Sequence, residues 1–168
     1  MLISKSGDLT ELVCSSATIL VKFELKHALA IQSQNILSVD DQTIQVTPLK
    51  VSGYRNATDL QNINSQKNVL QAYAEYELDY FKNDLHTELI NPNNQWVITK
   101  SKGWFIWYFK VGSVPVNVAK QVKIQLFAST IVGDNILTIN APIFTESDFT
   151  KAGLIVNEMM ETLTILKQ

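Results

Sequence analysis

The chain has 168 residues, of which 46% are hydrophobic, and 14 Lys and Arg against 16 Asp and Glu give a formal net charge of -2. This composition excludes an intrinsically disordered chain, which would have fewer apolar residues and a larger net charge. The charge balance also argues against a dedicated nucleic-acid binder, because such a protein needs a surplus of basic residues. We expect one folded domain over residues 1–168, since a chain of this length buries a core without disulfides or metals.

The first third of the chain has the residue pattern of β-strands. Apolar and polar residues alternate over 17–26, which predicts a half-buried strand. Two further β-prone runs, 35–39 and 43–47, flank residues 40–42, whose composition is typical of a short turn. The polar, irregular stretch 53–64 indicates a loop.

The pattern then changes to that of a helix. From Ser65 to Glu88 the apolar residues recur at steps of three and four, which predicts one long helix with a single apolar stripe. We expect Ser65 to be the N-cap, because its hydroxyl can accept an unpaired N–H of the first turn. The run 91–94, Asn-Pro-Asn-Asn, is expected to stop the helix. The stripe consists of Val69, Leu70, Tyr73, Ala74, Leu78, Phe81 and Leu85.

A second block of strands follows the helix. The predicted strands are 95–100, 104–111, 121–132 and 136–140. Residues 133–135 (Gly-Asp-Asn) tolerate the backbone of a tight hairpin, and residues 112–117 are expected to form a loop around a proline. Strand 104–111 is apolar on both faces, and such a strand is usually covered on both sides.

A second helix is predicted at the C-terminal end. Pro142 is expected to close the last strand, and Ser147 is the expected N-cap of a helix from Phe149 to Leu163. Its apolar stripe includes Gly153, where the missing side chain is expected to let a strand approach closely. Strands joined by short turns, with separate helices, predict an α+β fold: an antiparallel sheet flanked by a long central helix and a C-terminal helix.

The C-terminal half resembles a known family. The run 128–142 (ASTIVGDNILTINAP) is followed by an acidic helix start and a closing amphipathic helix over 149–163. With the long helix 65–88, this order is similar to the Mog1/PsbP-like group, which includes the DcrB-like proteins and the effector chaperones of bacterial type VI secretion. The resemblance, which extends over residues 65–166, implies an α/β/α sandwich around an antiparallel sheet. It also implies a non-catalytic binding or accessory role, and the group has no shared catalytic motif to place on this chain.

The sequence contains no recognisable catalytic motif. A Gly-x-Ser-x-Gly elbow and both glycine-rich phosphate-binding patterns are missing. Cys14 has no base placed beside it by spacing, and we interpret it as a small buried residue. Asp79, Asp84, His86 and Glu88 are too dispersed along the predicted helix to share one ion, and are interpreted as a solvated face. We therefore expect no catalytic residue, no metal site and no cofactor.

Aromatic side chains are the most distinctive feature of the sequence. The candidates for partner contacts are Trp96, Trp104 and Trp107 in one predicted hairpin and Tyr73, Tyr76 and Tyr80 along one flank of the predicted helix. Tryptophan and tyrosine are enriched among interface anchors, which favours a binding surface. The competing interpretation is burial, with the tryptophans in the core and the tyrosines at its boundary. The chain has a single arginine, Arg55, which argues against phosphate recognition.

Two functions of different classes stay open. The first is a non-enzymatic accessory module, chaperone- or adaptor-like, that binds a protein, a peptide or a second copy of the chain through an apolar sheet face. The alternative is a small-molecule-binding protein or an enzyme, with a pocket between helix 65–88 and the sheet. No apolar run of about 18 residues and no secretory signal is present, so we expect a cytoplasmic protein without a membrane span, unless a leader was removed. Residues 56–58 fit the glycosylation sequon, a pattern that often occurs by chance.

Overall fold

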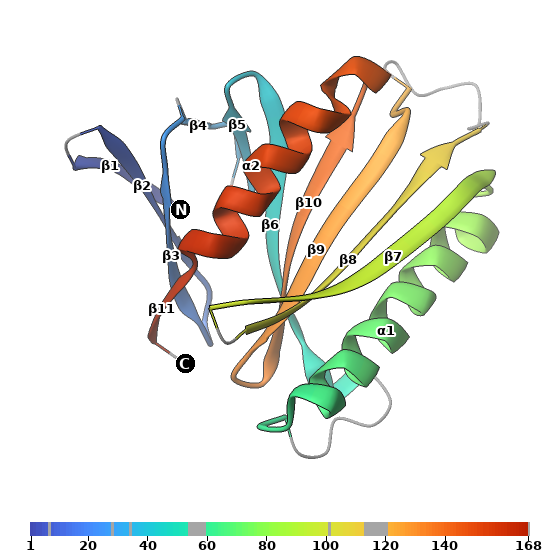
Figure 1. Cartoon of the computed structure of the whole chain (residues 1–168), viewed down its shortest axis with the longest axis horizontal. Helices are drawn as coiled ribbons and strands as arrows, with labels where there is room; N and C mark the ends of the chain where they lie inside the picture. The colour runs from blue at the N-terminus through green and yellow to red at the C-terminus, as the bar shows by residue number, and fades with distance from the viewer. Residues whose placement is uncertain are drawn as a thin grey trace.

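The strands form two antiparallel sheets in the computed structural model, which describes residues 1–6, 8–27, 29–33, 35–53, 60–100, 102–112 and 121–167 (Figure 1). The small sheet consists, in spatial order, of β1 (Leu2–Ser6), β2 (Leu9–Ser15), β3 (Leu20–Leu25) and β11 (Thr164–Lys167). The large sheet consists, in spatial order, of β4 (Leu29–Ile31), β5 (Ile36–Val39), β6 (Gln42–Lys50), β10 (Asn135–Ile143), β9 (Ile124–Val132), β8 (Lys102–Val111) and β7 (Leu89–Thr99).

Two α-helices pack on the large sheet. The helical segments are η1 (Val51–Gly53), α1 (Ile63–Asp79), the π-helical η2 (Tyr80–Asp84), η3 (Glu146–Asp148) and α2 (Phe149–Thr162). Helix α2 contacts β3, β9 and β10, whereas α1 contacts β8 and β9. In Figure 1, α2 crosses in front of β6 and β10, and α1 lies beside the β7 end of the sheet.

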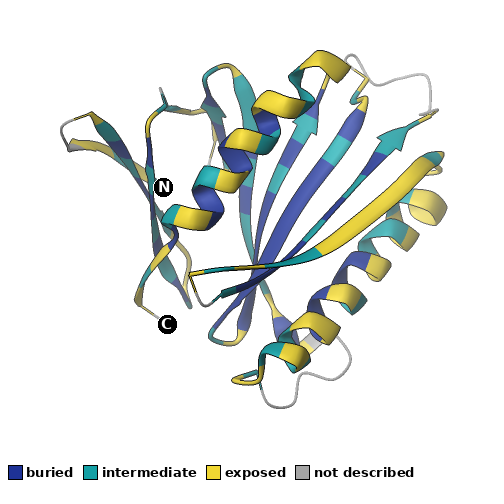
Figure 2. Cartoon of the chain, in the orientation of Figure 1, coloured by how far each residue is buried: buried dark blue, intermediate teal, exposed yellow. Residues whose placement is uncertain are grey.

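Two hydrophobic clusters lie on opposite faces of the large sheet. The first contains Trp104 of β8 together with side chains of the small sheet and α2, such as Phe23 and Val156. The second contains Phe105, the next residue of β8, together with side chains of α1 such as Leu70. Figure 2 shows the buried side of each helix facing the sheet. The predicted α+β fold, an antiparallel sheet between a long helix and a C-terminal helix, is confirmed.

The start of α1 differs from the prediction. Asn62, rather than Ser65, is the N-cap: its Oδ1 accepts hydrogen bonds from the backbone N–H of Asn64 at 2.9 Å and of Ser65 at 3.4 Å. Asn and Ser cap helices about equally well, so residue type alone could not decide between the two positions. The predicted stripe is buried at Val69, Leu70, Tyr73 and Ala74, but Leu85 lies beyond the helix and is exposed.

The prediction also failed where the helix ends. The helical backbone stops at Asp84, and residues 91–94, expected to form a helix stop, lie inside β7. The β7–β8 register shifts between Ile90 and Asn93, and Asn91 has a φ of 49°. An edge strand with a bulge accommodates Pro92, because the missing N–H then breaks no ladder between two strands.

Helix α2 begins after a short 3-10 turn. Ser147, predicted as the N-cap, lies inside η3, and the first α-helical residue is Phe149. Pro142, predicted to close the last strand, lies within β10 opposite Gln125. The pairing of β10 with β6 ends at Asn140, so Pro142 needs no N–H on that side.

The two predicted turns of the large sheet are confirmed. Asp40 and Asp41 connect β5 to β6 with φ values of 45° and 68°, the type I′ geometry that suits the right-handed twist of a hairpin. Gly133, with a φ of 55°, is the first loop residue between β9 and β10. Glycine adopts this backbone region without steric cost, so the loop needs only two residues.

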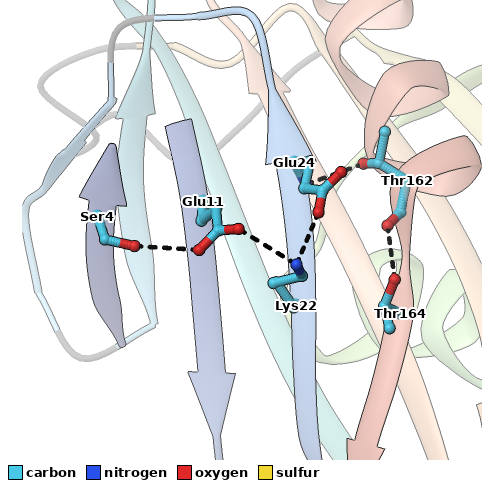
Figure 3. Close-up of polar contacts among 6 residues, drawn as sticks. All are labelled: Ser4, Glu11, Lys22, Glu24, Thr162 and Thr164. Carbon is cyan, nitrogen blue, oxygen red and sulfur yellow. Dashed lines mark hydrogen bonds and ion pairs between the residues drawn. The ribbon is translucent and has the colours of Figure 1, made fainter. Parts of the chain in front are cut away.

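The small sheet was predicted only in part, since the alternation over 17–26 corresponds to β3 and the turn before it. A chain of polar contacts crosses this sheet (Figure 3). Lys22 Nζ lies 3.2 Å from Glu11 Oε1 and 2.6 Å from Glu24 Oε1, and these hydrogen bonds, to Glu24 first and Glu11 second, raise the pKa of Lys22. The chain of contacts ends at Ser4 on β1 and, on the other side, at Thr162, the last residue of α2, and Thr164, the first residue of β11.

Candidate binding groove

Strand β8 has one fully covered face and one half-covered face. Phe105, Trp107 and Phe109 are all buried beneath α1. On the opposite face Trp104 is fully buried, but Ile106 and Tyr108 are only half-buried. Helix α2 packs mainly against β3, β9 and β10, so it covers this part of the sheet only in part. The strand predicted to be covered on both sides is therefore covered completely on one side only.

The half-covered face is the floor of a groove of about 390 Å³. One wall is the side of α2, and the opposite rim is the edge strand β7. Figure 2 shows that the rim formed by β7 is exposed over much of its length. The apolar lining consists of Ile106, Tyr108 and Leu126 from the sheet and Phe149, Gly153, Val156 and Met160 from α2.

The polar lining of the groove consists of amide side chains. Asn93 lies opposite Tyr108 and Gln95 opposite Ile106, and paired residues of antiparallel strands share a face of the sheet. Asn157 completes the polar rim, and its Nδ2 donates to Glu161 Oε1 at 3.3 Å. Asn94 also borders the groove, but it pairs with Trp107, so its side chain belongs to the α1 face. The amides of 93–95 make no hydrogen bond with the described part of the chain. None of the eleven lining residues carries a charge.

Gly153 widens the groove at its α2 wall. A Cβ atom built on Gly153 would meet no heavy atom within 4 Å, so the strand expected to approach closely at this position is not there. A glycine inside a helix lowers its stability by about 1 kcal/mol relative to alanine. No packing contact offsets this cost, because the space above Gly153 belongs to the groove.

One end of the groove is closed by contacts between α2 and β8. The rings of Tyr108 and Phe149 lie 5.2 Å apart, tilted by 57°. Beyond them Lys110 Nζ lies 3.2 Å from Glu146 Oε2, which connects β8 to η3. Exposed ion pairs stabilise little, so the ring contact is the main connection at this end.

The predicted aromatic candidates fall into two groups. Trp104, Trp107 and Tyr73 are at most 3% exposed and lie in the core. Trp107 stacks on Phe127 with ring centroids 3.8 Å apart, and Tyr73 meets Trp107 edge-on at 6.5 Å. A substitution at Trp107 would therefore disturb the packing of the core and would not test a surface contact directly.

The other three candidates reach the surface to different degrees. Tyr76 is 60% and Tyr80 42% exposed, one helical turn apart on the α1 side of the molecule. Trp96 is half-buried and packs over the aromatic cluster beneath α1. None of the six candidate residues lines the groove. Partner binding by Tyr76, Tyr80 and Trp96 stays a prediction.

A small cavity lies where the alternative function would need a pocket. Between α1 and the sheet it has a volume of about 50 Å³, lined by residues that include Gln71, Ala74 and Trp107. Binding sites for drug-sized ligands have volumes of about 300 to 1,000 Å³. This cavity holds a few water molecules at most. Trp107 is one of the residues that line it, and its Nε1 is buried without a described hydrogen-bond partner.

Two notable ionisable groups, Cys14 and His27, lie outside the groove lining. Burial raises the pKa of Cys14 to about 12, so its thiol stays protonated at neutral pH. His27 bridges two carboxylates: Nδ1 lies 2.5 Å from Asp40 Oδ2, and Nε2 lies 2.8 Å from Glu158 Oε2. Among the described residues, no three His, Cys, Asp or Glu are grouped so that they could hold a metal ion. The sequon 56–58, Arg55 and most of the predicted loop 112–117 lie outside the described residues.

The fold that these elements define is Mog1/PsbP-like, as the resemblance implied. The chain is similar to the solution structure of cyanobacterial PsbP (CyanoP) from Synechocystis sp. PCC 6803, with a TM-score of 0.55. The match covers 96% of this chain and 97% of that chain at 14% sequence identity, so it shows the fold. No protein-family model matches the chain, and no curated protein does. No helix in the described residues is long and apolar enough to cross a membrane.

Sequence reasoning did not find the groove. The sequence pattern at Gly153 predicts the close approach of a strand, whereas the structure has open space at that position. The Asn-Pro-Asn-Asn run predicts a helix stop, whereas Asn93 lines the groove from the edge strand β7. The half-burial of Ile106 and Tyr108 depends on where α2 crosses the sheet, which no local pattern contains.

Proposed function

We propose that the protein is a non-enzymatic accessory module that binds a segment of a partner protein in the groove between α2 and β7–β8. The observation that carries the proposal is Gly153, whose missing side chain opens the groove at a cost in helix stability. The half-buried apolar floor beside it gives a partner side chain a surface on which to bury apolar area.

The chemistry of the lining supports binding rather than catalysis. Its polar side chains are the amides of Asn93, Gln95 and Asn157 and the phenol of Tyr108, and none of the eleven lining residues has a carboxylate, imidazole, amine or thiol. General acid–base catalysis needs a group that exchanges a proton near the working pH. Amides do not, but they form hydrogen bonds with peptide groups as donor and as acceptor.

The fold and the cores are compatible with this role. The fold shared with cyanobacterial PsbP supports an accessory function by analogy, since fold alone does not fix function. We also propose that the chain acts as one domain, because both hydrophobic clusters include residues of the same large sheet. The small cavity under α1 does not favour the alternative, a small-molecule pocket at the tyrosine flank.

Photo-crosslinking in the native cell tests the proposal. A photo-reactive amino acid replaces Asn157 at the groove rim, and in a second strain it replaces Lys82, which is exposed on η2. We expect a discrete partner to be crosslinked from position 157 and not from position 82. The partner peptide joined to residue 157, identified by mass spectrometry, should come from one segment of the partner.

Filling the groove provides the decisive comparison. Gly153→Leu places a side chain into the open space, whereas Leu154→Ala changes a neighbouring residue that is 66% exposed and outside the lining. We expect Gly153→Leu to lower the crosslink yield at least about ten-fold, as the loss of an interface anchor does, and Leu154→Ala to leave it unchanged. Equal yields for a folded Gly153→Leu protein and the unaltered protein would show that the groove is not the binding site.

A further inference from the structure

We infer that the groove binds an uncharged, extended peptide segment with one apolar side chain seated above Gly153. This inference rests on the proposed function and specifies the chemistry of the partner segment. It follows from three features of the groove: the absence of charge in its lining, the position of its amides and the shape of its α2 wall.

The uncharged lining selects against charged segments. A Lys or Glu side chain in the groove would lose water and find no opposite charge among the eleven lining residues. Burying an ion without a partner is costly, whereas a neutral segment loses only hydrogen bonds that the amide rim replaces. Lys110 and Glu146, beyond the closed end, already form an ion pair with each other.

The amides favour a peptide over a purely apolar molecule. Asn93 and Gln95 are spaced as alternate residues of β7, so both face the groove, about one strand repeat apart. An extended peptide presents its backbone N–H and C=O groups with the same repeat. A lipid chain would bury the apolar floor but would leave these amides without hydrogen bonds, which lowers its affinity.

The space above Gly153 fits one side chain. The Cβ position is empty to at least 4 Å, and Val156 and Met160 of α2 continue the apolar wall. A volume of about 390 Å³ lies near the lower end of the range for ligand sites, which favours one anchoring side chain with its flanking peptide groups. The closed end at Tyr108 and Phe149 limits the length of segment that enters.

A set of capped heptapeptides tests the inference with the full chain. The first has a central leucine flanked by serine and threonine, and the second has a central serine instead. The third and fourth keep the leucine but have lysine or glutamate flanks, and 1-octanol serves as an apolar probe without peptide groups. Binding is measured from backbone amide shifts of the isotope-labelled protein, read at Asn94, Gly153 and Asn157.

We expect the neutral leucine peptide to shift these three signals and to bind at least about ten-fold more tightly than the serine peptide, as expected for burial of one leucine side chain. It should also bind more tightly than the two charged peptides, because their flanking charges find no opposite charge in the lining. The double variant Asn93→Ala, Gln95→Ala should weaken this peptide up to about ten-fold and leave 1-octanol unaffected. If this double variant does not fold, Asn157→Ala on the exposed side of α2 is expected to weaken the peptide about three-fold.

Three results would overturn the inference. In the first, the dissociation constants of the charged peptides lie within about two-fold of that of the neutral peptide. In the second, 1-octanol shifts the three signals and no peptide does. In the third, the amide variants bind the neutral peptide with unaltered affinity. If Gly153→Leu still removes the crosslinked partner in the cell, these results reject only the ligand class, and the proposed function stands. If Gly153→Leu keeps the partner, the proposed function itself fails.

Discussion

The indole ring of Trp96 on β7 lies over Gly103 on β8, in the position that a side chain at residue 103 would occupy. Gly103 pairs with Ile98, so Trp96 is its diagonal neighbour across the two strands. The carbonyl oxygen of Gly103 accepts a hydrogen bond from Thr130 Oγ1 at 2.8 Å, which holds its backbone from the other side. An aromatic ring that covers a strand glycine in this way stabilises the pairing of the two strands.

Gly103→Ala is expected to destabilise the protein by about 1–3 kcal/mol, because the new methyl group would overlap Cη2 and Cζ2 of Trp96. Urea unfolding monitored by circular dichroism measures this loss. In a Trp96→Ala background the ring is missing, so the additional loss from Gly103→Ala should shrink. Equal losses in both backgrounds would mean that the two residues are not coupled.

The same substitution at Gly153 should have the opposite effect. Its Cβ position is open, and alanine is the better helix former, so Gly153→Ala is expected to stabilise the protein by about 0.5–1 kcal/mol. Thermal unfolding checks the direction, with Gly103→Ala as the matched comparison. A loss of stability would show that the space above Gly153 is filled in solution.

Asp41→Gly is expected to stabilise the hairpin between β5 and β6 by up to about 1 kcal/mol. Asp41 has a φ of 68° at the second position of the turn, where glycine is preferred. The matched control is Asp134→Gly, at the second loop position of the β9–β10 hairpin, where the backbone is not left-handed. That control should be neutral or destabilising, and a similar gain from both variants would contradict the backbone explanation.

His27→Ala is expected to lower the free energy of unfolding by about 1–3 kcal/mol, because Asp40 and Glu158 both lose a contact with the imidazole. These contacts connect the turn after β5 to α2, so amide hydrogen exchange should increase in α2 near Glu158. His86→Asn is the control, since His86 is exposed with a φ of 49°, a conformation that asparagine tolerates. Comparable losses in the two variants would argue against a specific role of His27.

Cys14 is expected to resist alkylation in the folded protein at pH 8, because burial raises the pKa of its thiol to about 12 and the thiolate is the reactive form. The unfolded chain loses the same proton near the ordinary value of 9.0. The unfolded state therefore binds fewer protons between pH 9 and 12, and the contribution of Cys14 to stability falls as the pH rises through this window. Labelling with iodoacetamide, with and without urea, measures the difference, and a Cys14→Ala variant lacks this part of the pH dependence. Rapid labelling of the folded protein would contradict the burial of the thiol.

The elements with a one-sided burial pattern were predictable from the sequence. The alternation in β3 and the stripe of α2 are confirmed, because each element packs one face against the core. Strand β7 was predicted from residue 95 only, since Pro92 and its asparagine neighbours resemble a loop unless an edge position is known. β11 is a four-residue strand that follows α2 directly, too short for a periodic signal.

The groove could not be predicted because it depends on relations between elements. The residues that form it lie in α2 and in three strands, and each has an ordinary local role. The aromatic residues that attracted attention are instead divided between core packing, as at Trp104 and Trp107, and the surface of α1. Large apolar residues in the sequence therefore indicate the position of the core, whereas the missing side chain of Gly153 marks the position of the groove.

The bulge in β7 also affects how the protein behaves at high concentration. An open strand edge with regular hydrogen-bonding groups can recruit a strand of another molecule and begin fibril growth. At one end of the large sheet, Asn91 and Pro92 interrupt that row of groups in β7. At the other end, β4 has only three residues, Leu29–Ile31. We therefore expect both borders of the large sheet to recruit a strand of another molecule less readily than an uninterrupted edge strand would, although the apolar groove beside β7 stays open.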